Sequence, residues 1–82
     1  MLYKRALKDL ENLKRIGLNH KTKELLDRMA INPYITPPPY EKLTGDTAGT
    51  YSRRINALHR LVYAVDENVH IIYVYRMWTH YE

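Results

Sequence analysis

The spacing of apolar residues changes at Asn32-Pro33, and this change constrains the fold more than any other feature of the sequence. Before it, residues 4–16 carry apolar side chains at every third or fourth position with charged residues between them, and the apolar positions of residues 19–31 are Leu25, Leu26 and Met29. This is the pattern of amphipathic helices. Gly17 is typical of a helix end, so the short connection predicts an antiparallel helical hairpin.

After this point the chain enters a stretch rich in proline and glycine, residues 35–50, for which we expect a loop. Runs rich in Val, Ile and Tyr then predict three antiparallel strands, at residues 50–56, 59–65 and 69–78. Asp66-Glu67-Asn68 suits the turn between the last two. A helical hairpin followed by a meander predicts one α+β domain over residues 1–82. The helices would cover one face of a small antiparallel sheet and leave the other face open.

Composition narrows the class of protein further. The chain contains no cysteine, which excludes a disulfide framework and a thiolate metal site. No stretch approaches the roughly 18 apolar residues that a membrane span requires, and the first residues do not resemble a signal peptide. We therefore expect a soluble, cytoplasmic protein with no membrane partner.

Positive charge is concentrated in the helical half. Residues 1–35 hold eight Lys or Arg against four acids, whereas residues 36–82 hold five of each. A basic half joined to a neutral half fits a protein that docks on a polyanion with one surface. The alternative is that these cations only solvate two amphipathic helices.

A few polar residues outside the helices suit phosphodiester chemistry. The predicted loop offers one acid, Glu41, the strands carry Arg53, Arg54 and Arg60, and the chain ends in a segment containing His80. Cleavage of RNA by its own 2′-OH needs a base, fixed positive charge and an acid, and it needs no metal. These residue types alone are more often found in a binding protein than in a nuclease.

A resemblance to a known family favours the nuclease. Residues 51–56, Tyr-Ser-Arg-Arg-Ile-Asn, and residues 59–65, His-Arg-Leu-Val-Tyr-Ala-Val, are similar to the core motifs of the YoeB/Txe toxins in the RelE superfamily. Pro39-Tyr40-Glu41-Lys42-Leu43 resembles the loop that precedes this core, and His80-Tyr81 resembles the family's terminal pair. The matched segments keep the family's order over more than half of the chain.

The resemblance implies a role for three catalytic residues. Glu41 matches the family's general base, Arg60 matches the arginine that stabilises the transition state, and His80 matches the general acid. Each has a simpler reading: a solvated loop acid, a surface salt bridge and a polar tail, respectively. By strand alternation, Arg60 is expected on the face away from Leu61 and Tyr63.

Three further residues are implied in substrate binding. Arg54 matches an arginine that holds phosphate, Arg53 is its less certain neighbour because adjacent strand residues face opposite sides, and Tyr81 would stack on or orient the target nucleotide. His59 is interpreted as a structural histidine because it shares a strand face with core residues. Trp78 suits either an RNA stacking platform or an aromatic residue that closes the core.

The family also implies partners. Its members are toxins of type II toxin-antitoxin systems, ribosome-dependent mRNA interferases that need no metal or cofactor, and they pair with YefM/Axe-type antitoxins. We therefore expect the ribosome, mRNA and such an antitoxin as partners, and the chain is compatible with a homodimer. Family members usually open with a strand, for which Met1–Tyr3 is too short, so a truncated first strand is expected. The alternatives are a ParE-like toxin that inhibits gyrase without chemistry, and an inactive variant that only binds its antitoxin.

Overall fold

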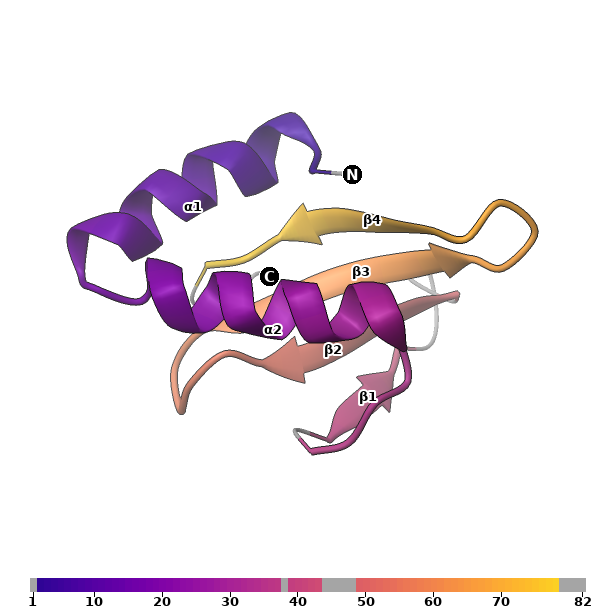
Figure 1. The fold of residues 1–82 in the computed structure, drawn as a ribbon. Coiled ribbons are helices and arrows are strands. Elements are labelled where there is room, and N and C mark those ends of the chain that lie inside the picture. Colours follow the sequence, from indigo (N-terminus) through magenta and orange to yellow (C-terminus); the bar gives the residue numbers. More distant parts are fainter. Residues whose placement is uncertain (1, 38, 44–48, 79–82) are drawn as a thin grey trace.

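The computed structural model describes residues 2–37, 39–43 and 49–78, which form two helices followed by four strands (Figure 1). The elements in chain order are α1 (Lys4–Arg15), α2 (Asn19–Ile31), β1 (Tyr40–Lys42), β2 (Thr50–Arg54), β3 (Arg60–Asp66) and β4 (Ile71–Arg76). The α+β class and the helices-first order predicted from the sequence are confirmed. No described helix has both the length and the apolar character that crossing a membrane requires.

The helical hairpin turns at Gly17. This residue has a φ of +77°, a left-handed conformation that glycine adopts without a steric penalty. Its N–H donates to the carbonyl of Lys14 at 3.2 Å, and the N–H of Leu18 donates to the carbonyl of Leu13 at 2.9 Å. These two bonds satisfy the last carbonyls of α1, so the predicted helix end is confirmed in the form of a Schellman motif.

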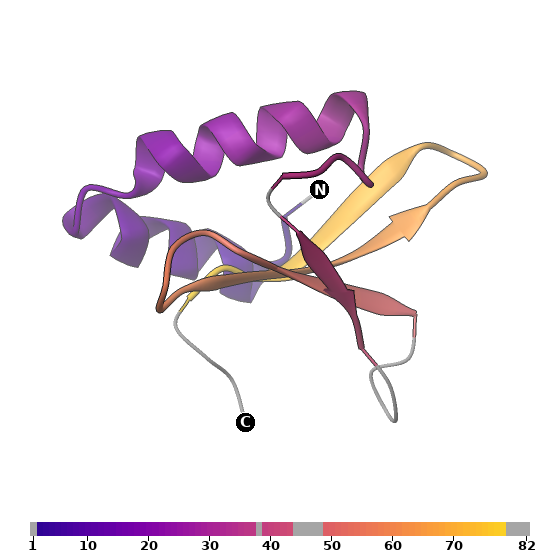
Figure 2. The ribbon, with the colours of Figure 1, turned by 90° about the horizontal axis from the view of Figure 1, so that it is seen from below.

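The four strands form one antiparallel sheet in the order β1-β2-β3-β4. The turn between β3 and β4 lies where the sequence predicted it, because the Asp66 carboxylate accepts bonds from the N–H groups of Asn68 and Val69 at 3.0 and 3.4 Å. Helix α2 lies over one face of the sheet, and Figure 2 shows that no helix of the described chain covers the opposite face. We call this second surface the open face.

The stretch expected to be a loop contains a strand. Residues Tyr40–Lys42 pair antiparallel with β2, so that Tyr40 lies opposite Arg53 and Glu41 lies opposite Ser52. The Tyr40 ring packs edge-on against the Tyr51 ring, with centroids 5.7 Å apart. This aromatic contact stabilises the pairing of the short segment with β2. The prediction of a loop through Glu41 was therefore wrong, although the flanking segments are irregular.

The core lies between the helices and the covered face of the sheet. Its buried members come from both helices, from β3 and β4, and from the residues that follow β2 and β4: Ala6, Leu13, Leu25, Met29, Ile55, Leu61, Tyr63, Val74 and Met77. The N-terminal segment adds a single parallel bridge from Leu2 to Val74, and the N–H of Tyr3 donates to the Val74 carbonyl at 3.0 Å. Within the described chain, this bridge stands in place of a full first strand.

Candidate active site on the open face of the sheet

Three polar side chains meet on the open face, one from each of the first three strands. Glu41 on β1 lies opposite Ser52 on β2, and Ser52 lies opposite Val62 on β3. Paired residues of an antiparallel sheet share a face, so Glu41 and Ser52 lie on one side. Arg60 is two residues before Val62 and lies on that side too, because Leu61 between them is buried in the core.

The Arg60 guanidinium joins this group together. Its Nη1 lies 3.4 Å from the Glu41 carboxylate and donates to the Ser52 hydroxyl at 3.1 Å. The exposed fractions of the Arg60 and Glu41 side chains are 30% and 70%, whereas Ser52 is buried. An ion pair this exposed stabilises a fold by only about 0–1 kcal/mol. The pair therefore leaves an accessible carboxylate beside a guanidinium that Ser52 orients.

Arg54 adds a second cation to the same face. It is exposed and lies directly opposite Arg60 in the register of β2 and β3. Like charges placed opposite each other on paired strands destabilise a sheet. The Arg54 side chain has no hydrogen bond or ion pair with another described residue, so nothing in the described chain offsets this repulsion. An anion bound between the two guanidinium groups would offset the repulsion.

Arg53 lies on the covered face, apart from this group. Its side chain is 1% exposed, its Nε donates to the Tyr63 hydroxyl at 3.3 Å, and its guanidinium lies over the Tyr40 ring. The same guanidinium donates to the carbonyl of Pro33 at 3.0 Å and to that of Ile35. These bonds fix the segment that leads from α2 into β1. The expected contact between Arg53 and substrate does not agree with this burial, and we assign Arg53 to holding β1 in place.

Burial also affects the tyrosine that Arg53 contacts. Tyr63 is fully buried, and removal of its hydroxyl from water raises the pKa of the phenol. The hydrogen bond from Arg53 acts in the opposite direction but is the smaller effect. Tyr63 is therefore a neutral phenol at physiological pH, and it accepts the Arg53 bond without gaining charge.

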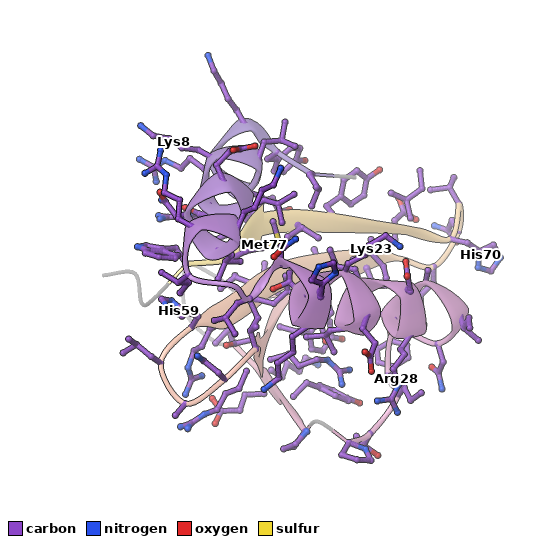
Figure 3. The ribbon with its side chains drawn as sticks, turned by 60° about the vertical axis from the view of Figure 1, so that its left-hand side comes forward. Lys8, Lys23, Arg28, His59, His70 and Met77 are labelled. Atoms are coloured by element: carbon purple, nitrogen blue, oxygen red, sulfur yellow. The ribbon has the colours of Figure 1, made fainter. Side chains whose placement is uncertain are left out.

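The end of the described chain is anchored beside the open face. The carboxylate of Asp9 on α1, only 4% exposed, accepts bonds from Arg76 Nε at 2.7 Å and from the Met77 N–H at 3.0 Å. This contact raises the pKa of the Arg76 guanidinium. Figure 3 shows Met77 between α1 and the sheet. Sequence reasoning missed Asp9, because an acid on an amphipathic helix is normally solvated.

Trp78 continues this anchor. Its ring stacks on His59 with centroids 4.3 Å apart, and its carbonyl accepts a bond from the N–H of Arg60 at 3.4 Å. His59 is 3% exposed, which agrees with its interpretation as a structural residue, and its Nδ1 has no hydrogen-bond partner within the described residues. Trp78 packs against the core, as the second of its two expected roles requires.

The last two expected site residues, His80 and Tyr81, lie outside the described residues. Ser52 was not predicted as a site residue, although it lies within the matched segment 51–56. Strand alternation from Arg54 and Arg60 would have placed Ser52 on their face. No group of three or more potential metal ligands occurs among residues 2–37, 39–43 and 49–78.

Comparison with known proteins identifies the family. The model of the "YoeB-like toxin of bacterial type II toxin-antitoxin system" family matches residues 4–81. The chain belongs to this family. It is therefore a toxin of a type II toxin-antitoxin system, as the motifs around residues 51–65 implied. A search of curated proteins found no match.

Solved structures agree with this assignment of the YoeB-like toxin. A YoeB/ParE toxin from Agrobacterium tumefaciens is 30% identical with a TM-score of 0.89, and the match covers 99% of this chain and 96% of that one. A YoeB-YefM complex from Staphylococcus aureus is 32% identical with a TM-score of 0.84, covering 99% and 94%. YafQ from Escherichia coli shares the fold at 19% identity, with a TM-score of 0.80 and coverage of 96% and 89%.

Proposed function

We propose that this YoeB-like toxin is a ribosome-dependent endoribonuclease that cleaves mRNA in the ribosomal A site. The observation that carries the proposal is the contact of Arg60 with both Glu41 and Ser52 on the open face. An accessible carboxylate beside an oriented guanidinium supplies a base and a fixed positive charge at one place. Membership of the family favours this chemistry over simple binding.

The proposed reaction proceeds by attack of the ribose 2′-OH on the adjacent phosphorus. Glu41 takes the proton of the 2′-OH as the new P–O bond forms, and His80 gives a proton to the 5′-oxygen as the old P–O bond breaks. The products are a 2′,3′-cyclic phosphate and a 5′-hydroxyl. Arg60 stabilises the charge that develops on the phosphate oxygens, and Arg54 binds the phosphate from the adjacent strand. No cofactor or metal takes part in these steps.

The described chain supports the role of the terminal pair by its reach. The Trp78 carbonyl is bonded to the Arg60 N–H. Only Thr79 separates Trp78 from His80, and two residue steps of fully extended chain span at most about 7 Å. We therefore propose His80 as the acid at the phosphate that Arg60 binds, and Tyr81 as the residue that stacks on the target nucleotide.

Partners follow from the same proposal. All eight Lys and Arg residues of the first 35 are exposed, and Figure 3 shows Lys8, Lys23 and Arg28 on the outside of the helices. We assign this basic surface to ribosomal RNA and the protein to the cytoplasm, where ribosomes work. The S. aureus relatives were solved as a YoeB-YefM complex and as a YoeB dimer. We propose a YefM-type antitoxin and a homodimer for this chain.

The test is to incubate programmed ribosomes with wild-type protein and with the variants Glu41→Ala, Arg60→Ala and His80→Ala. Wild type is expected to cut mRNA within the A-site codon and to leave the two named ends, and each variant is expected to lose most of this activity. If all three variants cleave like wild type, the residue assignment is wrong. If wild type does not cleave, the enzyme proposal is wrong.

A second candidate function follows from the name of one relative, the YoeB/ParE toxin of A. tumefaciens. A ParE-like toxin would inhibit DNA gyrase and would have no use for Glu41. A supercoiling assay with purified gyrase separates the two, because a nuclease leaves supercoiling unchanged. An inactive, antitoxin-binding variant would bind its antitoxin and fail both to cleave RNA and to arrest growth on expression.

A further inference from the structure

Three tyrosine rings form a second group on the open face, separate from the candidate active site. Tyr73 and Tyr75 on β4 alternate with the buried Val74, so both point to the side away from the helices. The Tyr3 ring packs on them both, with centroid distances of 6.1 Å to Tyr73 and 4.9 Å to Tyr75. We call these three residues the tyrosine cluster.

The tyrosine cluster is accessible and is not part of the core. The exposed fraction of Tyr3 is 38%, Tyr73 and Tyr75 are half-buried, and none belongs to the buried cluster beneath the helices. Partial burial raises the pKa of Tyr75, and the neighbouring Tyr3 and Tyr73 add to this effect. Half-exposed aromatic rings offer apolar faces and polar edges to a ligand.

The tyrosine cluster lies on the same surface as the proposed active site and close to it. Tyr73 is opposite Ala64 on β3, and Ala64 is opposite Thr50 on β2. Neighbouring strands lie about 4.8 Å apart, so β4 is about 10 Å from β2 across the sheet. Ser52 and Arg54 lie two and four residues along β2 from Thr50, which adds about 7 and 13 Å along the strand. Ala64, Val62 and Arg60 occupy the intervening positions on this side of β3. A few nucleotides of a splayed single strand cover this distance.

This arrangement of charge and rings suits single-stranded RNA. Proteins hold unpaired bases by stacking them on aromatic side chains beside a cationic track for the backbone. Here the cationic track is formed by Arg54 and Arg60, and Lys4 and Arg5 follow Tyr3 directly at the start of α1, both exposed. An acidic protein would also bind the cations. Stacking on flat aromatic faces beside them is instead typical of nucleic-acid bases.

We propose that the tyrosine cluster is a stacking platform for an unpaired RNA base that flanks the cleaved phosphate. This proposal rests on the proposed function, because it requires RNA on the open face. The base would stack on the ring surface left exposed by Tyr3, Tyr73 and Tyr75, while Arg54 and Arg60 hold the phosphate. The platform would then fix the position of the strand before chemistry.

The test combines a protein variant with a changed RNA. Programmed ribosomes carry mRNA with one abasic nucleotide at each position around the cut, and the enzymes are wild type and Tyr73→Leu/Tyr75→Leu. Loss of base stacking costs roughly 5- to 100-fold in affinity. We expect one abasic position to raise the wild-type KM by about tenfold with little change in kcat. The leucine variant should show the same loss on intact mRNA and no further loss with that abasic nucleotide.

Two controls separate stacking from folding. Tyr73→Phe/Tyr75→Phe keeps the rings and should recover most of the affinity that the leucine variant loses. Tyr34→Leu removes a ring that packs against Tyr40 and Tyr51, and it should retain the wild-type sensitivity to the abasic position. If the leucine substitution raises KM by the same factor over wild type on abasic mRNA as on intact mRNA, the two losses are independent and the proposal is overturned. So would a leucine variant that keeps the wild-type KM and loses only its affinity for an acidic antitoxin.

A binding arm keeps this result separate from the proposed function. Glu41→Gln protein and mRNA with a 2′-deoxy nucleotide at the cut cannot react, so the affinity for the programmed ribosome is measured without cleavage. One outcome is that wild type fails to cleave while the abasic nucleotide still weakens the binding of proteins that keep the tyrosine rings and not that of the leucine variant. In that case the platform stands and the nuclease assignment fails. If cleavage occurs and the abasic series has no effect, the platform fails alone.

Discussion

The two faces of the sheet use arginine in opposite ways. On the covered face, Arg53 is buried and its guanidinium is held by two backbone carbonyls and the Tyr63 hydroxyl. On the open face, Arg60 is accessible and contacts Glu41, while Arg54 lies exposed beside it. Arg53 and Arg54 are consecutive in the chain, so alternation alone separates a residue that holds the fold from one that can hold a ligand.

The largest expected effect is on the open face. Arg60→Ala removes the charge that stabilises the transition state, so we predict a fall of about 10²- to 10³-fold in kcat for mRNA cleavage. The free energy of unfolding should fall by only about 1–2 kcal/mol, because the ion pair with Glu41 is exposed and the bond to the buried Ser52 hydroxyl is lost. Cleavage kinetics and urea denaturation of the same protein measure both. A large loss of stability would show that Arg60 is mainly structural.

The matching change on the covered face should have the reverse outcome. Arg53→Met leaves the Pro33 and Ile35 carbonyls without their donor, and we predict a loss of about 3 kcal/mol in the free energy of unfolding. Activity measured well below the unfolding midpoint should fall less than it does for Arg60→Ala. Unchanged stability with a large loss of kcat would mean that Arg53, and not its neighbour, works in the site.

A smaller effect is expected where α1 meets the end of β4. Asp9→Asn weakens the charged bonds to Arg76 and to the Met77 N–H, and we predict a loss of about 2 kcal/mol in stability. Thermal unfolding by circular dichroism measures it. The exposed pair Lys23–Asp27 gives the control, because Asp27→Asn should cost less than about 0.5 kcal/mol. Equal losses of stability for the two substitutions would show that the burial of Asp9 does not strengthen its bonds.

The smallest expected effect concerns pH. Partial burial and a bond to Glu67 raise the pKa of Tyr34 from 10 to about 12. The folded state therefore favours the neutral phenol, and this contribution is complete below pH 10 and is lost as pH rises through 12. Tyr34→Phe should reduce the alkaline loss of stability between pH 9 and 12 by less than about 1 kcal/mol, since solvent screens a partly exposed group. Urea midpoints at the two pH values test this; identical alkaline losses in both proteins would contradict it.

The sequence predicted the fold well because the features that decide it are local. Helical spacing before Asn32-Pro33 and alternation after it distinguish helices from strands residue by residue. The length of β1 explains why it was missed, since three residues are too few to show alternation and its partner strand comes eight residues later. Leu7 and Ile16 follow the helical pattern but are about half exposed, because the buried side of α1 is centred on Ala6 and Leu13.

The site was predicted less completely because its contacts are long-range. The position of Arg60 on the open face followed from its neighbours Leu61 and Tyr63, and the structure confirms that position. The burial of Asp9 could not be seen locally, because its partners Arg76 and Met77 lie more than sixty residues away. The burial of Arg53 could not be predicted for a similar reason, since the carbonyls that hold it belong to a segment with no regular pattern.

If the open face carries the chemistry, the single-turnover rate of Glu41→Gln on programmed ribosomes must fall steeply. This substitution keeps the size of the side chain and removes the base. We predict a rate about 10²- to 10⁴-fold below wild type, with an unchanged free energy of unfolding. A variant that cleaves mRNA at the wild-type rate would contradict the account.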